Sequence, residues 1–268
     1  MLKVVIAGVS GRMGHALLDG VFSDSGLQLH AALDRAESAM IGRDAGEQFG
    51  KVSGVKITSD INAALNGADV LVDFTRPEAT MQYLQACQQS KVKLVIGTTG
   101  FSEAEKASIE AASKNVGIVF APNMSVGVTL LINLVEQAAR VLNEGYDIEV
   151  VEMHHRHKVD APSGTALRLG EAAAKGIDKA LKDCAVYARE GVTGEREAGT
   201  IGFATLRGGD VVGDHTVVLA GVGERVELTH KASSRATFAQ GALRAAKFLA
   251  DQPTGLFDMR DVLGFEKT

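Results

Sequence analysis

The chain opens with a short apolar strand, a glycine-rich turn and a helix in direct succession, and this order restricts the fold most. Residues 3–7 (KVVIA) form an apolar, β-branched run that predicts a buried strand. Gly8, Gly11 and Gly14 follow as G-x-x-G-x-x-G, and a helical pattern continues through Val21. The amides of such a turn can approach a pyrophosphate at the helix N-terminus, which indicates a dinucleotide-binding βαβ unit. A glycine turn alone is weak support, because glycine also adopts a positive φ where no ligand binds.

An acidic residue after the next apolar run supports the cofactor interpretation. The run covers residues 27–33 and ends in Asp34 and Arg35, and Asp34 lies 20 residues after Gly14 (34 − 14 = 20). At this spacing an acidic residue usually meets the ribose hydroxyls, and a neighbouring arginine can accept a 2′-phosphate. The pair predicts tolerance of both NADH and NADPH and leaves the preference open. A solvated Asp–Arg pair is the alternative, but the order of strand, turn, helix and acid favours a cofactor.

Alternating strands and helices extend this pattern. Apolar runs at residues 70–75, 94–96 and 117–120 alternate with helical patterns at 78–90 and 102–115. The alternation predicts an α/β fold with a Rossmann-type, doubly wound parallel sheet, in which ligands bind at the carboxyl ends of the strands. Those ends carry small, polar and glycine residues that suit a nicotinamide ribose, at 8–14, 34–35, 74–76, 97–100 and 121–125.

The second half of the chain shows a different order of predicted helices and strands. A helical pattern at residues 128–142 precedes a strand at 147–153, and three runs at 201–207, 211–220 and 225–230 read as consecutive hairpin-linked strands. We therefore expect a second, α+β domain with a mixed or antiparallel sheet. The predicted division is a dinucleotide-binding domain at 1–125, completed by 237–268, and a substrate-binding and oligomerisation domain at 126–236.

Composition excludes several classes of protein. The 268 residues are 46% hydrophobic with a net charge of −5, which supports a folded core and argues against nucleic acid as a partner. No apolar run reaches membrane-spanning length, so no membrane is expected. Cys87 and Cys184 form no CxxC pair, which fits the reducing cytoplasm, where we expect the protein.

The densest group of reactive side chains lies at residues 154–158, where three histidines, an arginine and a lysine occur together. A metal site is not expected, since adjacent histidines on a strand face opposite sides and no H-x-x-x-H spacing is present. A solvated basic loop is the other alternative, and it suits His157 alone. Ser163–Thr165 begin a helical pattern, whose exposed amides and dipole favour an anion. A carboxylate, or better a dicarboxylate, fits this site, and histidine titrates near working pH. Together with the nucleotide fold, the group predicts hydride transfer followed by protonation.

These residues carry a family resemblance. The pattern E-x-H-H-x-x-K-x-D-x-P-S-G-T-A over residues 152–166 resembles the signature of the dihydrodipicolinate reductase family. The resemblance extends over the chain through the glycine turn, D-F-T-R-P at 73–77, G-T-T-G at 97–100 and A-x-N-x-S at 121–125. It implies NADH- or NADPH-dependent reduction of (2S,4S)-4-hydroxy-2,3,4,5-tetrahydrodipicolinate in the diaminopimelate route to lysine, with hydride added at C4 and a proton at C3. It also implies a homotetramer formed through the second domain.

The resemblance assigns roles by position. His154 matches the position of the family's proton donor and acceptor, and Lys158 matches that of the second proton donor. His155, Gly164 and Thr165 match positions that contact the substrate. Ser163 begins the group of backbone amides that would receive a carboxylate. Asp34 stands where many relatives carry glutamate, which shortens its reach to the ribose. The implied cofactor contacts are Gly8, Val9, Ser10, Gly11, Arg12, Met13, Asp34, Arg35, Gly97, Thr98, Thr99, Ala121, Pro122, Asn123 and Met124.

Rival functions remain. An oxidoreductase acting on another cyclic imine or keto acid would share these features. A non-catalytic nucleotide sensor would lack the acid–base cluster, which this chain keeps. A semialdehyde-type dehydrogenase needs a nucleophilic cysteine, and neither Cys87, within a predicted helix, nor Cys184 is well placed.

Overall fold

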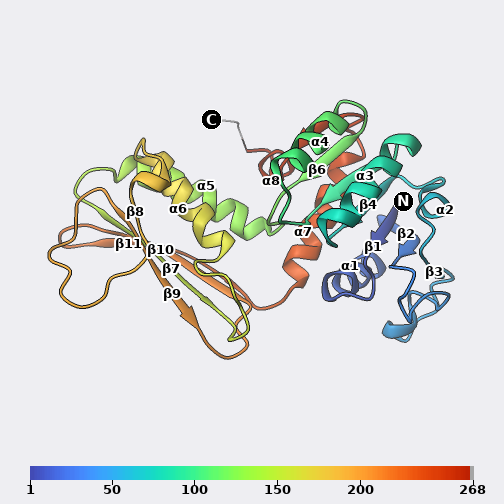
Figure 1. Ribbon diagram of the computed structural model, residues 1–268, viewed down its shortest axis with the longest axis horizontal. Helices are drawn as coiled ribbons and strands as arrows, with labels where there is room; N and C mark the ends of the chain where they lie inside the picture. Colours follow the sequence, from blue (N-terminus) through green and yellow to red (C-terminus); the bar gives the residue numbers. More distant parts are fainter. Residues whose placement is uncertain (266–268) are drawn as a thin grey trace. The chain divides into compact units, whose positions relative to one another are not determined.

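The computed structural model describes residues 1–265 and contains two compact units (Figure 1). Within the described residues, unit 1 comprises Met1–Val126 together with 235–265, and unit 2 comprises Gly127–Ser234. The last three residues of the predicted completing segment 237–268 lie outside the described residues. Each unit has its own sheet and its own buried apolar core.

Unit 1 is built on a seven-stranded sheet in the order β12-β6-β5-β4-β1-β2-β3, and all of its strand pairs are parallel. The order reverses between β1 and β4, which creates the crevice where such sheets bind ligands. The prediction of a doubly wound parallel sheet is confirmed. The strands are β1 (Leu2–Ala7), β2 (Leu27–Leu33), β3 (Ile57–Thr58), β4 (Val70–Asp73), β5 (Lys93–Ile96), β6 (Gly117–Phe120) and β12 (Gly255–Phe257).

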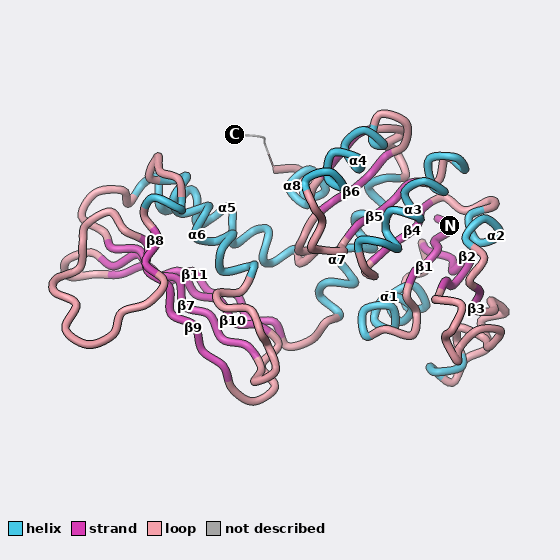
Figure 2. Tube along the Cα trace, viewed as in Figure 1, coloured by secondary structure: helices cyan, strands magenta, loops and turns pink. Residues whose placement is uncertain are grey.

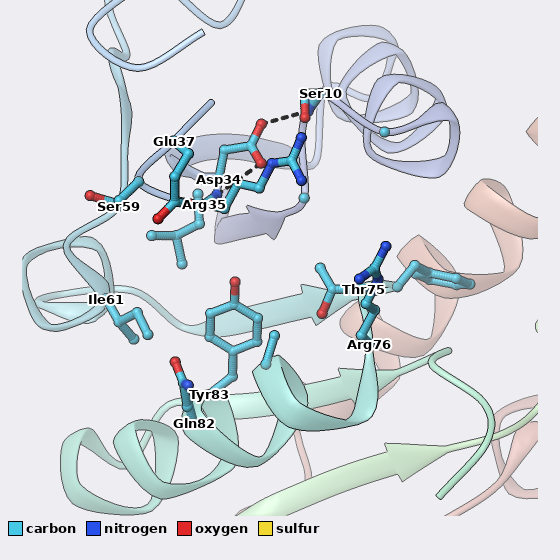
Figure 3. Close-up of a pocket in the computed structure, with 16 residues that line it drawn as sticks. Ser10, Asp34, Arg35, Glu37, Ser59, Ile61, Thr75, Arg76, Gln82 and Tyr83 are labelled. Carbon is cyan, nitrogen blue, oxygen red and sulfur yellow. Dashed lines mark hydrogen bonds between the residues drawn. The ribbon is translucent and has the colours of Figure 1, made fainter. Parts of the chain in front are cut away.

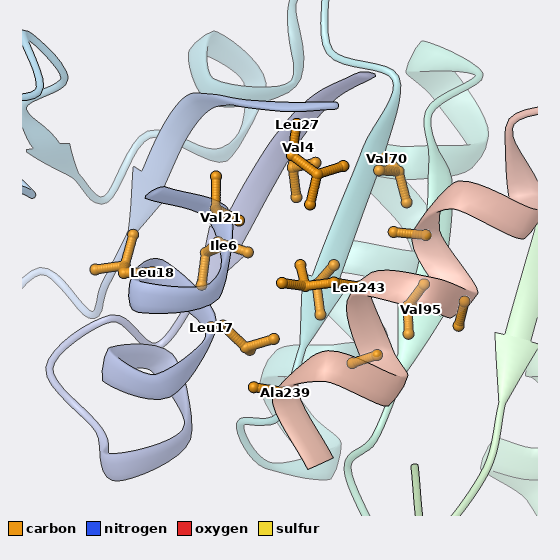
Figure 4. Close-up of a cluster of buried hydrophobic side chains, with 14 of the residues drawn as sticks. Val4, Ile6, Leu17, Leu18, Val21, Leu27, Val70, Val95, Ala239 and Leu243 are labelled. Carbon is orange, nitrogen blue, oxygen red and sulfur yellow. The ribbon is translucent and has the colours of Figure 1, made fainter. Parts of the chain in front are cut away.

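Helices cover both faces of this sheet, which explains the uninterrupted apolar strands. Val4 and Ile6 pack with α1 (Arg12–Ser23), α7 (Ala236–Leu249) and α8 (Met259–Leu263), a core shown in Figure 4. Val5 and Ala7 point the other way. They pack in a second cluster whose helices are α2 (Ile61–Leu65), α3 (Pro77–Ser90) and α4 (Glu103–Ser113).

Unit 2 contains a five-stranded mixed sheet in the order β11-β10-β7-β9-β8, with β7–β9 and β8–β9 parallel and the other pairs antiparallel. Figure 2 shows α5 and α6 on one side of it, where they close the apolar core of the unit. The mixed sheet agrees with the prediction. The elements are α5 (Val126–Val141), β7 (Asp147–His154), α6 (Gly164–Gly176), β8 (Ala185–Val186), β9 (Ile201–Arg207), β10 (Gly213–Ala220) and β11 (Arg225–Ala232).

The predicted pairing within this sheet is partly wrong. β10 and β11 form a hairpin, as expected, but β9 and β10 do not pair, because β7 lies between them. Their connection, residues 208–212, crosses the carboxyl end of β7 instead of turning back. The Gly208 amide donates to the His154 carbonyl at 3.0 Å, and the His155 amide donates to the Val211 carbonyl at 2.8 Å. A glycine-containing turn is compatible both with a hairpin and with a short connection that crosses a third strand. The sequence around residues 208–212 therefore could not show which of the two forms.

Short elements complete the chain. Single 3₁₀ turns lie at Glu47–Phe49 and Leu181–Asp183. Within residues 1–265, no helix combines the length and apolarity that crossing a membrane requires.

Candidate functional site

The glycine turn of unit 1 begins α1 at the carboxyl end of β1, and no side chain caps the helix N-terminus. Gly8 has a φ of 68°, and Gly11 caps α1 without any side-chain hydrogen bond. Gly14 packs against the turn itself: a Cβ there would lie 2.1 Å from the Gly8 carbonyl oxygen and 2.6 Å from the Val9 Cα. The amides of this first turn can therefore receive an anion such as a phosphate.

A cavity of about 710 Å³ opens beside this turn. Figure 3 shows Ser10, Asp34 and Arg35 along its wall, and the Tyr83 ring directed into it from α3. Its size and its position at the carboxyl ends of β1, β2 and β4 suit the adenosine half of a dinucleotide. The lining residues are Gly8, Ser10, Gly11, Leu33, Asp34, Arg35, Ala36, Glu37, Ser59, Ile61, Phe74, Thr75, Arg76, Ala79, Gln82 and Tyr83.

The Asp34 carboxylate is tied to the glycine turn. It accepts hydrogen bonds from the Ser10 amide at 3.1 Å, the Arg35 amide at 2.9 Å and the Ser38 hydroxyl at 3.1 Å. These bonds fix the end of β2 against the turn and aim the acid along the cavity wall. Asp34 and Arg35 thus lie together where the sequence predicts the ribose contacts.

The other predicted cofactor residues follow the carboxyl ends of β1, β5 and β6. Val9 is buried, Arg12 is exposed and Met13 packs on the core, and none of these three lines the cavity. Residues 97–99 follow β5 and residues 121–124 follow β6. They stand at the carboxyl ends of the neighbouring parallel strands, outside the 710 Å³ cavity.

Asp73 and Tyr83 also shape this region, and the sequence analysis named neither as a site residue; Tyr83 lines the cavity, whereas Asp73 does not. Asp73 is fully buried at the end of β4 and accepts from the amide and hydroxyl of Thr75 and from the Thr80 hydroxyl. Burial raises the pKa of Asp73, and it raises the pKa of Tyr83 to about 12 with help from the carboxylates of Asp73 and Asp34. Tyr83 is therefore a protonated donor in the cavity. Its place within α3 gave no local signal beyond that of a core aromatic.

In unit 2, the carboxyl end of β7 carries a buried acid–imidazole pair. His154 Nδ1 lies 2.6 Å from Glu152 Oε2, and the exposed fractions of the two side chains are 11% and 1%. The residues alternate along β7, so both face the same side of the strand, toward the core. The neighbouring His155 follows the last residue of β7 and is half-buried, with its ring centroid 6.2 Å from that of His157.

Arg207 and Ser163 complete the surroundings of Glu152. Arg207, at the end of β9, donates Nη1 to Oε2 at 2.8 Å and Nη2 to Oε1 at 2.9 Å, and the Ser163 amide donates to Oε1 at 3.1 Å. Burial alone would raise the pKa of Glu152. The donors Arg207 and His154 and the Ser163 amide outweigh that effect, and the pKa is lowered. The sequence analysis named neither Glu152 nor Arg207 as a site residue.

Ser163 joins this group to the start of α6. Its hydroxyl accepts from the Ala166 amide at 3.1 Å and so caps the helix, and it also lies 3.0 Å from His215 Nε2. The His215 ring meets the His154 ring edge-on, with centroids 5.0 Å apart. Burial, and then the charge of His154, lower the pKa of His215 to about 4, so His215 is neutral at working pH. His215 is a further residue that the sequence reasoning missed.

Lys158 joins the same group through Asp160. Lys158 Nζ lies 2.7 Å from Asp160 Oδ1, and the Asp160 carbonyl accepts from Arg207 Nη2 at 2.6 Å. Gly164 is exposed at the first position of α6 and Thr165 follows it. Among predicted catalytic and substrate residues, His154, Lys158 and the start of α6 are thus linked by one hydrogen-bonded network.

Arg156 and His157 are exposed beside the network, and for His157 this agrees with the solvated position that the sequence analysis allowed. Over residues 1–265, no group of three or more histidine, cysteine or acidic side chains is arranged to hold a metal ion.

Comparison with known proteins matches nearly the full length of the chain. The family described as dihydrodipicolinate reductase, N-terminus, matches residues 2–124, and dihydrodipicolinate reductase, C-terminus, matches residues 127–263. A curated 4-hydroxy-tetrahydrodipicolinate reductase of Thiobacillus denitrificans is 65% identical over 265 residues, 99% of each chain. The protein of that name from Laribacter hongkongensis is 63% identical over 263 residues, 98% of each chain.

Solved structures share the fold at lower identity. A dipicolinate-bound dihydrodipicolinate reductase from Paenisporosarcina sp. TG-14 has a TM-score of 0.77 and 24% identity, and the match covers 96% of this chain and 97% of that one. An amine dehydrogenase from Mycobacterium smegmatis follows the same architecture with a TM-score of 0.60 at 15% identity, over 95% of this chain and 94% of that one. Matches to both halves and high identity over the full length agree with the architecture, and the chain belongs to the dihydrodipicolinate reductase family.

Proposed function

We propose that the protein is a 4-hydroxy-tetrahydrodipicolinate reductase, an NAD(P)H-dependent oxidoreductase of lysine and diaminopimelate biosynthesis. It would convert (2S,4S)-4-hydroxy-2,3,4,5-tetrahydrodipicolinate into tetrahydrodipicolinate. The observation that carries the proposal is the network joining His154, Lys158 and the start of α6, in a chain 65% identical to a relative of that name. This network offers proton donors beside a carboxylate site, which is what reduction of a cyclic dicarboxylate imine requires.

Unit 1 fits a nicotinamide dinucleotide. The amides at the start of α1 would hold the pyrophosphate, because the turn carries no side-chain cap and Gly14 permits close packing. The cavity beside Asp34 and Arg35 would hold the adenosine ribose, with Tyr83 as a neutral donor. Residues 97–99 and 121–124 would then border the nicotinamide half. When bound, the reduced cofactor supplies a hydride to C4 of the dehydrated, conjugated imine.

The residues of unit 2 would bind the substrate and manage its protons. One carboxylate would be received by the Gly164 and Thr165 amides at the positive end of α6, with His155 as a further contact. His154 and Lys158 would supply the proton that C3 takes up after the hydride arrives. The dipicolinate in the Paenisporosarcina protein is a cyclic dicarboxylate of the same kind, which supports this choice of substrate class.

A homotetramer in the cytoplasm is part of the proposal, on the strength of the family resemblance. Sedimentation of the purified protein measures the assembly directly, and a monomer at micromolar concentration would contradict it.

The decisive experiment is a coupled assay. Substrate is made freshly by the preceding aldol condensation, and oxidation of NADH and of NADPH is followed separately. Turnover with at least one cofactor is expected, and omission of the aldolase is the control. Absence of turnover with both cofactors, in protein that binds NADH, would favour a reductase of another cyclic imine or keto acid.

A further inference from the structure

We propose that Glu152 is the positioning residue for His154: held by Arg207, it fixes the imidazole so that only Nε2 exchanges protons with the substrate. Glu152 does not touch the substrate in this arrangement and acts through His154. The proposal rests on the proposed function for its kinetic consequence, although the proton arrangement itself can be measured without turnover.

The donors around Glu152 determine where the protons lie. Its carboxylate oxygens accept two bonds from Arg207 and one from the Ser163 amide, at 2.8, 2.9 and 3.1 Å. A guanidinium and a backbone amide can only donate, and a permanent cation bonded to both oxygens favours the ionised carboxylate, in line with the lowered pKa of Glu152. An ionised carboxylate can only accept, and the hydrogen in the 2.6 Å contact with His154 therefore sits on Nδ1. Nε2 is left as the exchanging nitrogen.

The surroundings of His154 keep the ring in this orientation. His215 packs edge-on against it with centroids 5.0 Å apart, and the His215 Nε2 bonds to the Ser163 hydroxyl, so it does not compete with Glu152 for the His154 ring. On β10, Gly213 faces Nε2, because a Cβ built there would lie 3.0 Å from that atom. A flipped ring would lose the bond to Glu152, and a larger residue at Gly213 would crowd the reactive nitrogen.

The proton balance of the step follows from this arrangement. The imidazolium form carries hydrogens on both nitrogens. When C3 of the reduced substrate takes a proton, the Nε2–H bond breaks and a C–H bond forms. The neutral ring that remains is the Nδ1–H form already bonded to Glu152, and water reprotonates Nε2 for the next cycle. No change of tautomer interrupts the cycle.

The kinetic test compares two glutamate-to-glutamine substitutions on β7. Glu152→Gln removes the charge that orients His154. Glu149→Gln is the matched control: Glu149 lies on the opposite face of β7 and is likewise held by arginines, Arg189 at 2.8 Å and Arg196 at 3.0 Å. We expect kcat of Glu152→Gln to fall roughly 10²-fold, within the range of general acid–base catalysis, while the NADH dissociation constant stays unchanged. The control keeps wild-type kcat.

Two further readouts separate positioning from simple structural damage. In Glu152→Gln the alkaline limb of the kcat–pH profile should move to lower pH, because the imidazolium loses its anionic neighbour. Imidazole nitrogen NMR of histidine-labelled wild-type protein should show His154 protonated on Nδ1 in its neutral form, and Glu152→Gln should populate both tautomers.

Three results would overturn the proposal: equal kcat in the two glutamine variants, an unmoved pH profile, or an Nε2–H tautomer in the wild type. If Glu152→Gln does not fold, the wild-type tautomer and Gly213→Ala decide, since the added Cβ should lower kcat and leave NADH binding intact. A wild type that shows the Nδ1–H tautomer but no turnover would contradict the proposed function and leave the proton arrangement standing.

Discussion

Two adjacent histidines at the end of β7 differ in what surrounds them. His154, the last residue of β7, is buried against Glu152, whereas His155 follows the strand and is half-buried. Alternation along β7 places the side chains of residues 152 and 154 on one face of the strand. It gives His154 a fixed carboxylate partner in Glu152.

Substitution of Lys158 should slow turnover without weakening cofactor binding. Lys158→Ala should lower kcat by about 10²- to 10⁴-fold, because it removes a proton donor from the network, and NADH affinity should stay near wild type. Stopped-flow reduction and NADH fluorescence titration measure the two quantities. Arg156→Ala is the control, an exposed cation two residues away. Collapse of NADH binding in Lys158→Ala would place the lysine in the cofactor site instead.

Arg35 allows a test of cofactor tolerance. Arg35→Ala should raise KM for NADPH about 10-fold or more, since a charged hydrogen bond to a 2′-phosphate contributes on the order of 1.5–3 kcal/mol. KM for NADH should change little. Glu37→Ala, another residue of the same cavity, is the control and should not raise KM for NADPH. An equal loss for both cofactors in Arg35→Ala would mean that the arginine maintains the cavity and does not discriminate.

At the scale of elements, a substitution at the start of α6 should weaken substrate binding without lowering the stability of the fold. A Cβ built on Gly164 meets no atom within 4 Å. Gly164→Ala should therefore fold normally and unfold at the same temperature or slightly higher, because alanine loses less backbone entropy than glycine. The methyl group would project where a carboxylate approaches the amides, so KM for the substrate should rise.

Gly14→Ala is the contrasting variant. Its Cβ would lie 2.1 Å from the Gly8 carbonyl oxygen, so the turn must move and the melting temperature should fall. Thermal unfolding followed by circular dichroism compares it with Gly164→Ala. A Gly14→Ala protein as stable as the wild type would show that the turn can relax.

The long elements were predictable from sequence, and the short ones were not. Strands such as β1 and β4 are apolar throughout because helices cover both faces, and the helices have clear starts and stops. By contrast, β3 and β12 are too short to show a period, and β12 pairs with β6 only through contacts remote in sequence.

The same distinction holds for the site in unit 2. His154, Lys158 and Ser163–Thr165 are close in sequence and could be identified together. Arg207 and His215 reach them from β9 and β10, on either side of β7. Strand order and register place those two residues, and neither can be read from a local pattern.

At the scale of the whole molecule, His215 should make stability depend on pH. It is buried, and its Nδ1 has no hydrogen-bond partner among residues 1–265. Its pKa is about 4 when folded and 6.5 when exposed, so the unfolded chain binds the proton first as pH falls. The contribution of His215 is complete above pH 6.5, declines toward pH 4 and amounts to at most about 3 kcal/mol.

Urea unfolding between pH 7 and pH 4.5 measures this effect. His215→Gln should flatten the slope of unfolding free energy against pH in this window. Glu152 acts in a different range, because its lowered pKa makes its contribution disappear below the ordinary range of a glutamate. His230, whose pKa is also lowered by burial, should leave a residual slope. An identical slope in both proteins would contradict the assignment to His215.

The crossover of residues 208–212 over β7 also has a consequence for the order of folding. Glu152 and Arg207 are 55 residues apart, so a growing chain makes the carboxylate long before its guanidinium partner exists. Closing so long a loop is slow compared with forming α5 or α6. We expect the acid–imidazole pair to reach its working arrangement late, when β9 and β10 settle on either side of β7. Refolding followed by secondary structure should therefore finish before enzymatic activity returns.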